Sequence, residues 1–421
     1  MRASQSTKPY VYINAKANSL TLSINATTVY SFDKKGRLIG AYLEGTNYKR
    51  GFDNSILKKW SEPEQGQKRR QREKLGDRNR RAFLHRMTET LESIARNPDN
   101  YQLEIPGDEE ETWNWFNRCL TYDWEKLERD AEHFSEIYKP VTILPPDQYY
   151  ALVLQISEGC SYNKCTFCNF YRDRRFRIKS PGEVMNHIDQ VNDFFDESLG
   201  LRRSIFLADA NALIIPQPRL IRILEIINEN YTLITDPDRR RELHSRRREG
   251  EAVFEGIYSF IDLFTGEYKS SEEFREMASL GVKRAYIGME SGSEALLDFL
   301  NKPGSKQNMI DAVNKVKAGG VDVGVIVLVG AGGREYHEGH IEDTADALNR
   351  MRLDEHDFIY FSEFRPQPGT PYHQIAKEEG IQSLSRAESD QQEERLREKL
   401  QYTGKDDSPQ LSTYDIREFL Y

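Results

Sequence analysis

Beyond residue 140, short apolar runs alternate with amphipathic stretches, and this alternation restricts the possible folds more than any other feature. The run at 149–156 is almost continuously apolar, as expected of a strand that is buried on both faces. Helical spacing of apolar residues follows at 181–195. Five more strands are predicted, each separated from the next by a helical pattern, at 204–208, 252–261, 284–288, 321–329 and 358–364. Six consecutive strand–helix units indicate parallel strands with right-handed crossovers, in either an open doubly wound sheet or a barrel.

The residues before 140 form a different kind of region. Short alternating stretches with a turn predict a β-meander at 10–43. The segment 58–86 is strongly basic, with eleven Lys and Arg residues against four acids, and helical spacing overlaps its end and continues to residue 94. We therefore expect three parts, namely an N-terminal α+β region with a basic segment, an α/β core, and a C-terminal helical extension with a tail, at 1–139, 140–373 and 374–421.

Composition and charge narrow the class of protein. The chain is 38% hydrophobic and 30% charged, and it lacks a run of eighteen apolar residues, so no spanning helix and a cytoplasmic location are expected. The net charge of -9 argues against an overall basic nucleic-acid binder. The basic runs at 58–86 and 239–248 are interpreted as a solvated linker or helix face. Contact with RNA, DNA or an anionic peptide leader is the less favoured alternative, and few aromatic residues interleave with either run to support base stacking.

Three of the four cysteines lie within nine residues, at Cys160, Cys165 and Cys168. A disulfide framework would spread and pair its cysteines, so this cluster indicates a metal site built from soft thiolate ligands. A structural zinc site needs four protein ligands, whereas an iron–sulfur cube held by three cysteines leaves one iron open. The zinc alternative would recruit a distant ligand such as Cys119 or His187, although Cys119 by itself is typical of a small buried hydrophobe.

Polar residues and glycines follow the later predicted strands. Asp209 ends the second strand, Glu290 and Ser291 lie in a Glu-Ser-Gly turn after the fourth, and Gly330 opens a glycine-rich turn after the fifth. Arg365 follows the sixth strand. The carboxyl ends of parallel strands meet at one edge of a sheet or at the top of a barrel, which is where ligands bind.

With the cysteines, these motifs resemble the radical S-adenosylmethionine (SAM) superfamily, over about residues 149–373. The resemblance implies a partial (β/α)6 barrel in which Cys160, Cys165 and Cys168 hold a [4Fe-4S] cluster and S-adenosyl-L-methionine chelates the fourth iron. It also implies an enzyme that cleaves SAM reductively to a 5'-deoxyadenosyl radical for hydrogen abstraction, using a reductant such as flavodoxin or ferredoxin. Phe167 occupies the position that packs near the cofactor's adenine. Four residues separate the first two cysteines instead of the usual three, so the chain resembles a variant member.

The same resemblance suggests cofactor contacts at the strand ends. Asp209 would meet the amino group of the cofactor, Glu290 and Ser291 its ribose, and Gly330 would end the strand behind the adenine. Arg365 would pair with the cofactor carboxylate, a substrate acid, or a neighbouring acid in a structural ion pair. Asp209 and the serines of the turn are also placed to cap the helices that follow them.

The substrate and the catalytic residues are not assigned by any motif. Cys119 is the one further cysteine, so a second cluster is not expected, and no Asp-x-His-x-x-Gly cobalamin signature occurs. Tyr258 and Asp262 on the third strand are candidates for substrate contact, with core or capping roles as the alternative. The competing class is a non-catalytic zinc or iron–sulfur module of a nucleic-acid adaptor, which would have a closed four-ligand site.

Overall fold

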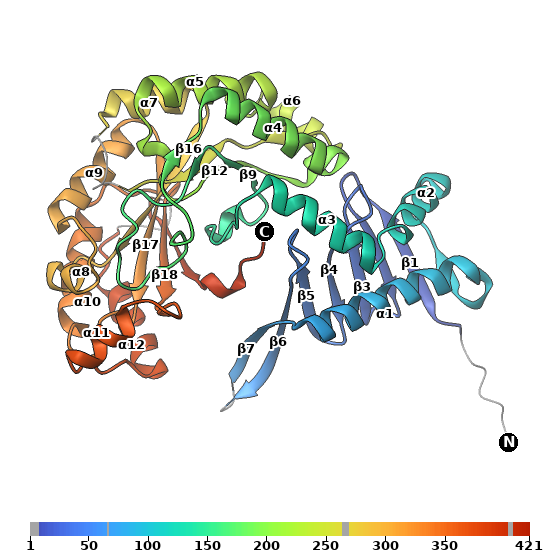
Figure 1. Cartoon of the computed structure of the whole chain (residues 1–421), viewed down its shortest axis with the longest axis horizontal. Coiled ribbons are helices and arrows are strands. Elements are labelled where there is room, and N and C mark those ends of the chain that lie inside the picture. The colour runs from blue at the N-terminus through green and yellow to red at the C-terminus, as the bar shows by residue number, and fades with distance from the viewer. Residues whose placement is uncertain (1–7, 65–66, 263–268, 403–406) are drawn as a thin grey trace.

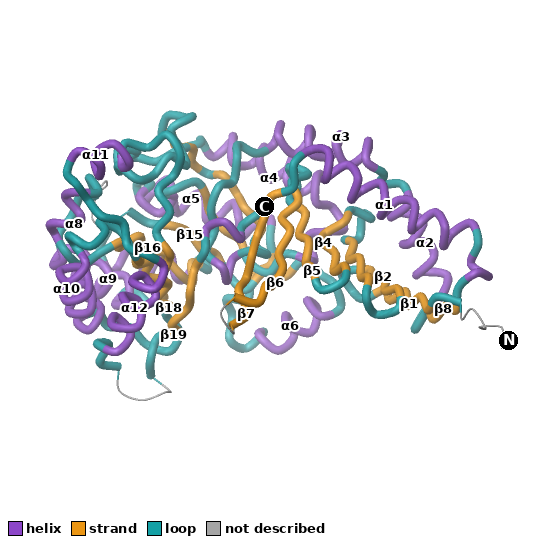
Figure 2. Tube along the Cα trace, turned by 90° about the horizontal axis from the view of Figure 1, so that it is seen from below, coloured by secondary structure: helices purple, strands orange, loops and turns teal. Residues whose placement is uncertain are grey.

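Two lobes lie side by side in the computed structural model (Figure 1), which describes residues 8–64, 67–262, 269–402 and 407–421. The N-terminal lobe is a sheet with helices on one face. The second lobe is a curved parallel sheet with helices along its outer side, and its open side faces the first lobe (Figures 1 and 2).

An eight-stranded sheet builds the N-terminal lobe. Its neighbours are antiparallel except β1 and β8, in the order β7-β6-β5-β4-β3-β2-β1-β8. The strands are β1 (Tyr10–Ala15), β2 (Leu20–Ile24), β3 (Thr28–Phe32), β4 (Leu38–Leu43), β5 (Thr46–Arg50), β6 (Ile56–Glu64), β7 (Gln67–Lys74) and β8 (Gln102–Glu104). Helices α1 (Asp77–Arg96), α2 (Glu109–Leu120) and α3 (Trp124–Ile137) contribute apolar side chains to the core beside this sheet. The predicted meander and the helical pattern ending at residue 94 are confirmed.

The second lobe contains seven parallel strands. They are β9 (Leu152–Gln155), β12 (Ile205–Ala208), β15 (Ile257–Phe260), β16 (Val282–Glu290), β17 (Asp322–Val329), β18 (Phe358–Glu363) and β19 (Gln410–Tyr414). Their order in the sheet follows the order in the chain, without the reversal of a doubly wound sheet. The six predicted strand–helix units and the partial (β/α)6 barrel are therefore confirmed.

Helices cover the outer side of these strands. They are α4 (Pro181–Phe195), α5 (Gln217–Asn230), α7 (Ser271–Ser279), α8 (Glu294–Phe299), α9 (Lys306–Ala318), α10 (His337–Arg350), α11 (Tyr372–Glu378) and α12 (Arg386–Glu398). In α4, Ser180 and Glu183 form a capping box and Pro181 occupies the first turn, so the helix begins where the sequence predicts. Short 3₁₀ helices lie at Pro98–Asn100, Pro146–Gln148, Asp196–Leu201, Ala212–Ile214 and Ile416–Glu418.

Two local predictions were wrong or incomplete. The expected C-terminal tail instead contains β19, which pairs in parallel with β18. The predicted strand at 252–261 is split, because β14 (Val253–Phe254) pairs with β13 (Thr232–Leu233) and only β15 joins the barrel. The arginine-rich run forms helix α6 (Arg240–Arg248), in which Leu243 is the one buried residue, and this agrees with its interpretation as a solvated helix face. A further two-stranded sheet joins β10 (Ser157–Glu158) to β11 (Arg177–Ile178), on either side of the cysteine segment.

The last residues of the chain connect the two lobes. Lys49 Nζ of the first lobe donates a hydrogen bond to the carbonyl of Leu420 at 2.9 Å. The Tyr421 hydroxyl accepts a hydrogen bond from the amide of Val153, in the first barrel strand, at 2.8 Å. These contacts cross the predicted division at residues 139 and 140, which stays a prediction, as does the division at 373 and 374.

Candidate functional site

A pocket of about 200 Å³ opens at the carboxyl ends of the barrel strands. Its wall is mainly apolar, with a few charged and amide groups, which is typical of a site for a small molecule. The lining residues that bear on its chemistry are Cys160, Tyr162, Cys165, Phe167, Cys168, Asn211, Asp262, Gly288, Glu290, Lys302, Phe364, Arg365, Tyr414 and Ile416.

All three clustered cysteines line this pocket, and none is in a disulfide. Burial raises the pKa of Cys165 to about 12 and that of Cys168 to about 11, and it also raises the pKa of Cys160. Such thiols ionise when a metal ion coordinates them, because the ion's charge overrides the cost of burial. Three free thiols that face one pocket from one loop are a donor set that fits an iron–sulfur cluster.

Asp209 anchors the start of the cysteine loop. Its Oδ2 accepts a hydrogen bond from the amide of Gly159, immediately before Cys160, at 2.8 Å. The same carboxylate accepts from Gln155 Nε2 at 3.0 Å and pairs with Arg174 at 3.4 Å. The side chain is 3% exposed, and among the described residues it is not part of the pocket wall.

A second segment holds the middle of the loop. The amide of Thr166 donates to the Leu300 carbonyl at 3.0 Å, and Asn301 Nδ2 donates to the Lys164 carbonyl at 2.8 Å. The Tyr162 hydroxyl donates to Asn301 Oδ1 at 3.0 Å. These bonds lie on both sides of Cys165, so they fix its position relative to residues 300–302.

An ion pair lies in the pocket wall next to this segment. Lys302 Nζ is 2.9 Å from Glu290 Oε1, and the two side chains are 12% and 11% exposed. Burial lowers the pKa of Lys302, but Glu290, Cys165 and Asp262 raise it further, so the pKa ends above its ordinary value and the side chain stays charged. Gly288 leaves room for the pair, because a Cβ there would collide with Glu290 Oε1 and lie 3.2 Å from Lys302 Nζ.

The structure divides the other predicted contact residues into two groups. Phe167, Glu290 and Arg365 line the pocket, and Arg365 also pairs with its neighbour Glu363. Ser291, by contrast, is buried against α10, with its hydroxyl 2.7 Å from His340 Nδ1. Gly330 takes a positive φ of 89°, and its amide donates to Gln392 of α12 at 2.7 Å.

The two proposed fourth ligands of a zinc site lie elsewhere. Cys119 is 1% exposed in the core of the N-terminal lobe, as predicted for a small buried hydrophobe. His187 Nε2 accepts a hydrogen bond from the amide of Gln155 at 3.0 Å, and burial lowers its pKa to about 3. Neither residue is placed to close the cysteine site with a fourth ligand. The two strand-three candidates also separate, since Asp262 lines the pocket and Tyr258 belongs to the core.

Several pocket residues were missed from the sequence. Lys302 lies in a loop without a motif, and its position depends on hydrogen bonds that the two preceding residues, Leu300 and Asn301, make to a segment more than a hundred residues earlier. Tyr414 and Ile416 enter the wall because β19 completes the sheet. Asn211 follows Asp209 by two residues, and its Nδ2 donates to Ser161 Oγ at 2.7 Å.

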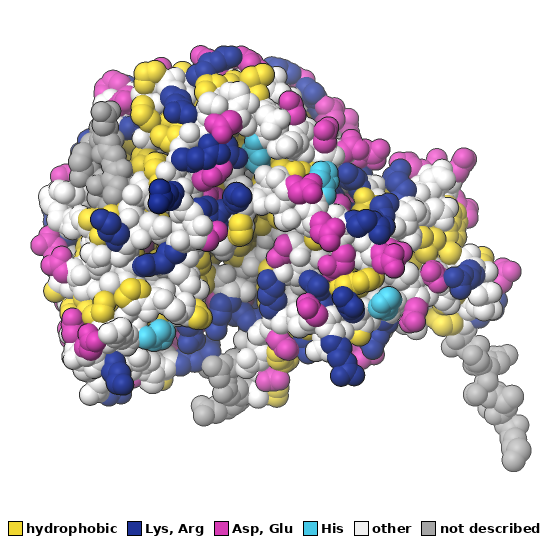
Figure 3. Space-filling view, in the orientation of Figure 1, with side chains coloured by type: hydrophobic (Ala, Val, Ile, Leu, Met, Phe, Trp, Pro, Cys, Tyr) yellow, Lys and Arg dark blue, Asp and Glu magenta, His cyan; other side chains and the backbone are white. Residues whose placement is uncertain are grey.

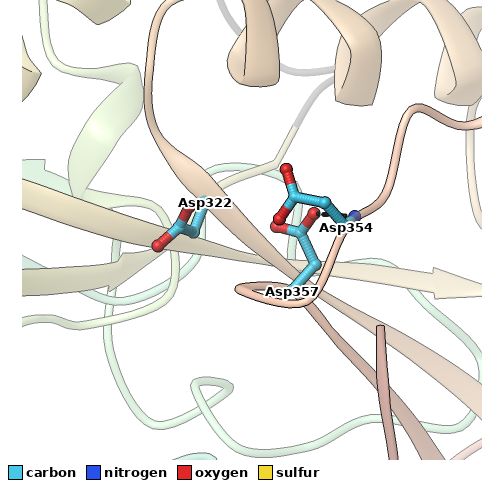
Figure 4. A group of neighbouring side chains, drawn as sticks. All are labelled: Asp322, Asp354 and Asp357. Atoms are coloured by element: carbon cyan, nitrogen blue, oxygen red, sulfur yellow. Dashed lines mark hydrogen bonds between the residues drawn. The ribbon is translucent and has the colours of Figure 1, made fainter. Parts of the chain in front are cut away.

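A separate acidic group lies at the amino ends of β17 and β18 (Figure 4). Carboxylate oxygens of Asp322, Asp354 and Asp357 lie within 4.8 Å of one another. Lys317 Nζ lies 2.8 Å from Asp357, 2.9 Å from Asp354 and 3.6 Å from Asp322. A single ammonium group of the chain therefore contacts all three acids and offsets part of their negative charge.

Several residues of the basic runs pair with acids, and the face drawn in Figure 3 carries basic and acidic side chains side by side. In α6, Arg246 pairs with Glu251 at 2.7 Å and Arg247 with Glu255 at 2.5 Å. In β7, Arg72 pairs with Asp415 of the C-terminal segment. Among the described residues, no helix is both long and apolar enough to cross a membrane.

Comparison with known proteins finds a family that matches part of the chain. Residues 154–348 match the family model of the radical SAM superfamily. Over 175 residues the chain is 25% identical to 4'-phospho-dehydrooxetanocin synthase from Priestia megaterium, a match that covers 41% of this chain and 22% of that protein.

Two solved structures illustrate the likeness. SuiB from Streptococcus suis, bound to S-adenosylmethionine, is 12% identical with a TM-score of 0.40, over 88% of this chain and 72% of that chain. Coproporphyrinogen III oxidase (HemN) from Escherichia coli is 12% identical with a TM-score of 0.38, over 62% of this chain and 55% of that chain. The fold assignment rests on the strand order of this chain itself.

Proposed function

The chain carries a domain of the radical SAM superfamily, and on this premise we propose that the protein is an enzyme that cleaves S-adenosyl-L-methionine reductively. Cys160, Cys165 and Cys168 would hold a [4Fe-4S] cluster with one iron left open for the cofactor. When bound, the cluster and cofactor supply a 5'-deoxyadenosyl radical, which abstracts a hydrogen atom from a substrate that is not identified. A flavodoxin or ferredoxin is the proposed source of the electron.

One observation carries this proposal, namely that three free cysteines from one loop face one pocket at the carboxyl ends of the barrel strands. A closed zinc site would need a fourth protein ligand there. The two candidates from the sequence are both engaged elsewhere, Cys119 in the core of the other lobe and His187 in a hydrogen bond to the backbone.

The pocket residues would bind and orient the cofactor. Phe167 offers an aromatic face beside Phe364, with ring centroids 6.1 Å apart, to an adenine. Glu290 has a carboxylate in the wall that can accept hydrogen bonds from ribose hydroxyls. Arg365 can pair with a carboxylate of the cofactor or the substrate if it leaves Glu363.

The remaining predicted contacts would act through other residues. Asp209 would hold the cysteine loop instead of touching the cofactor's amino group, because its oxygens bond Gly159 and Gln155. Ser291 would fix the Glu-Ser-Gly turn on α10, and Gly330 would fix the end of β17 on α12.

The test is anaerobic reconstitution with iron and sulfide, followed by dithionite and SAM. We expect about four irons per chain and formation of 5'-deoxyadenosine, and we expect Cys165→Ala to lose both. Cys119→Ala is the matched control, because it removes a thiol from the N-terminal core and should leave iron loading unchanged. A wild-type protein that binds zinc tightly, takes up no iron and forms no 5'-deoxyadenosine would refute the proposal.

A further inference from the structure

Lys302 is a charged residue of the pocket wall that no sequence motif singles out. It follows α8, and its backbone amide donates to the Leu297 carbonyl at 2.8 Å. The preceding residues, Leu300 and Asn301, bond the cysteine loop on both sides of Cys165. The position of the ammonium group is therefore tied to the cysteine loop.

Lys302 lines the same pocket as Cys160, Cys165 and Cys168. Its ammonium group therefore exerts a positive field on any cluster that the three cysteines hold. The Lys302 side chain is 12% exposed, so solvent screens this field less than it would at the surface. The negative charge of Glu290, whose Oε1 lies 2.9 Å from Lys302 Nζ, offsets part of the positive field of the lysine.

We propose that Lys302 and Glu290 together set the reduction potential of the cluster held by the three cysteines, with Lys302 raising it and Glu290 lowering it. This inference rests on the proposed function. Reduction adds one negative charge to an iron–sulfur cluster, and the potential depends on nearby charge, hydrogen bonds to sulfur and solvent exposure. A fixed cation favours the reduced state, and a fixed anion disfavours it.

The signs of the two effects make the inference testable. In redox titrations of the reconstituted protein without SAM, followed by the EPR signal of the reduced cluster, Lys302→Met should shift the midpoint to more negative potential. Glu290→Gln should shift it to more positive potential. We expect the ratio of reduced to oxidised cluster at a fixed potential to change about tenfold, or about 59 mV for one electron. Lys302→Arg keeps the charge and should stay close to wild type.

A control variant and a measurement of iron content show whether a shift in midpoint potential comes from the pocket charges. Lys306→Met removes a surface lysine that pairs with Asp343 and Asp346, and it should not move the midpoint. If Lys302→Met loads less iron, Glu290→Gln still tests the opposite shift. Unchanged midpoints in both pocket variants, or shifts of the same sign, would overturn this inference while leaving the proposed function intact. Failure of the wild-type protein to assemble a cluster would instead overturn the proposed function.

Discussion

Replacing Asp209 distinguishes between two alternative roles of its carboxylate, namely contact with the cofactor and anchoring of the cysteine loop. As a cofactor contact, its loss would weaken SAM binding and leave the cluster in place. As the anchor of the cysteine loop, its loss would reduce iron loading even before SAM is added. The structure favours the second role, because Oδ2 receives the Gly159 amide at 2.8 Å and Oδ1 receives Gln155 Nε2 at 3.0 Å.

The size of the effect follows from burial. The side chains of Asp209 and Arg174 are 3% and 7% exposed, so Asp209→Ala leaves a buried cation with weaker compensation. Breaking a buried pair costs roughly 3–5 kcal/mol. Arg174 keeps its hydrogen bonds to the Pro140 carbonyl and to Asp173, both at 3.1 Å. Because these bonds remain, we expect the free energy of unfolding to fall by about 3 kcal/mol, the lower end of that range. Asp209→Asn keeps one acceptor oxygen and should lose less.

The assay is iron content after anaerobic reconstitution and desalting, together with urea unfolding of the protein without the cluster. We expect Asp209→Ala to weaken iron retention about tenfold, which corresponds to about 1.4 kcal/mol of lost loop ordering. Asp173→Asn is the control, since that carboxylate also meets Arg174 but is 56% exposed and should cost less than about 1 kcal/mol. Normal iron loading by Asp209→Ala, with weaker SAM binding alone, would refute the anchoring role.

Three further predictions concern the pocket and its frame. Gly288→Ala should weaken SAM binding about tenfold in calorimetry, because the added methyl group displaces the Lys302–Glu290 ion pair. Gly182→Ala is the control, since a Cβ at Gly182 has open space around it and should leave SAM binding unchanged. Equal SAM affinities in the two variants would contradict this account. Lys317→Met should lower the free energy of urea unfolding by about 3–5 kcal/mol because it leaves the three aspartates of Figure 4 uncompensated, against less than about 1 kcal/mol for Lys306→Met. Burial lowers the pKa of His340 from 6.5 to about 4, so its contribution to stability is complete above pH 6.5 and is lost, by up to about 3 kcal/mol, as the pH falls to 4. Unfolding curves across that window should show the decline, and a His340→Asn variant with the same pH slope would show that this histidine is not its source.

The barrel was predictable because the sequence patterns that indicate its strands and helices lie within each element. The apolar run of β9 is buried at every position, and the capping box at Ser180 marks the start of α4 within a few residues of sequence. The cysteine site was predictable for the same reason, because one loop supplies every proposed ligand.

The remaining features depend on distant partners. The position of Lys302 depends on the hydrogen bond between its neighbour Asn301 and Lys164 in the cysteine loop. No local sequence pattern predicts this contact. Strand β19 has a mostly exposed, polar sequence, since it is an edge strand and buries little besides Tyr414. The position of Asp209 after the second predicted strand singles it out, but sequence alone does not tell whether its carboxylate faces a ligand or a backbone amide.

The placement of the C-terminal segment also bears on when the pocket forms during synthesis. Tyr414 and Ile416 complete its wall, and Tyr421 links the first barrel strand to the N-terminal lobe. Domains generally begin folding from the N-terminus while the ribosome is still elongating the chain. The cysteine loop is therefore synthesised well before this part of the pocket wall. For the proposed cluster, this order of synthesis would leave one side of the pocket open until β19 and Ile416 are in place.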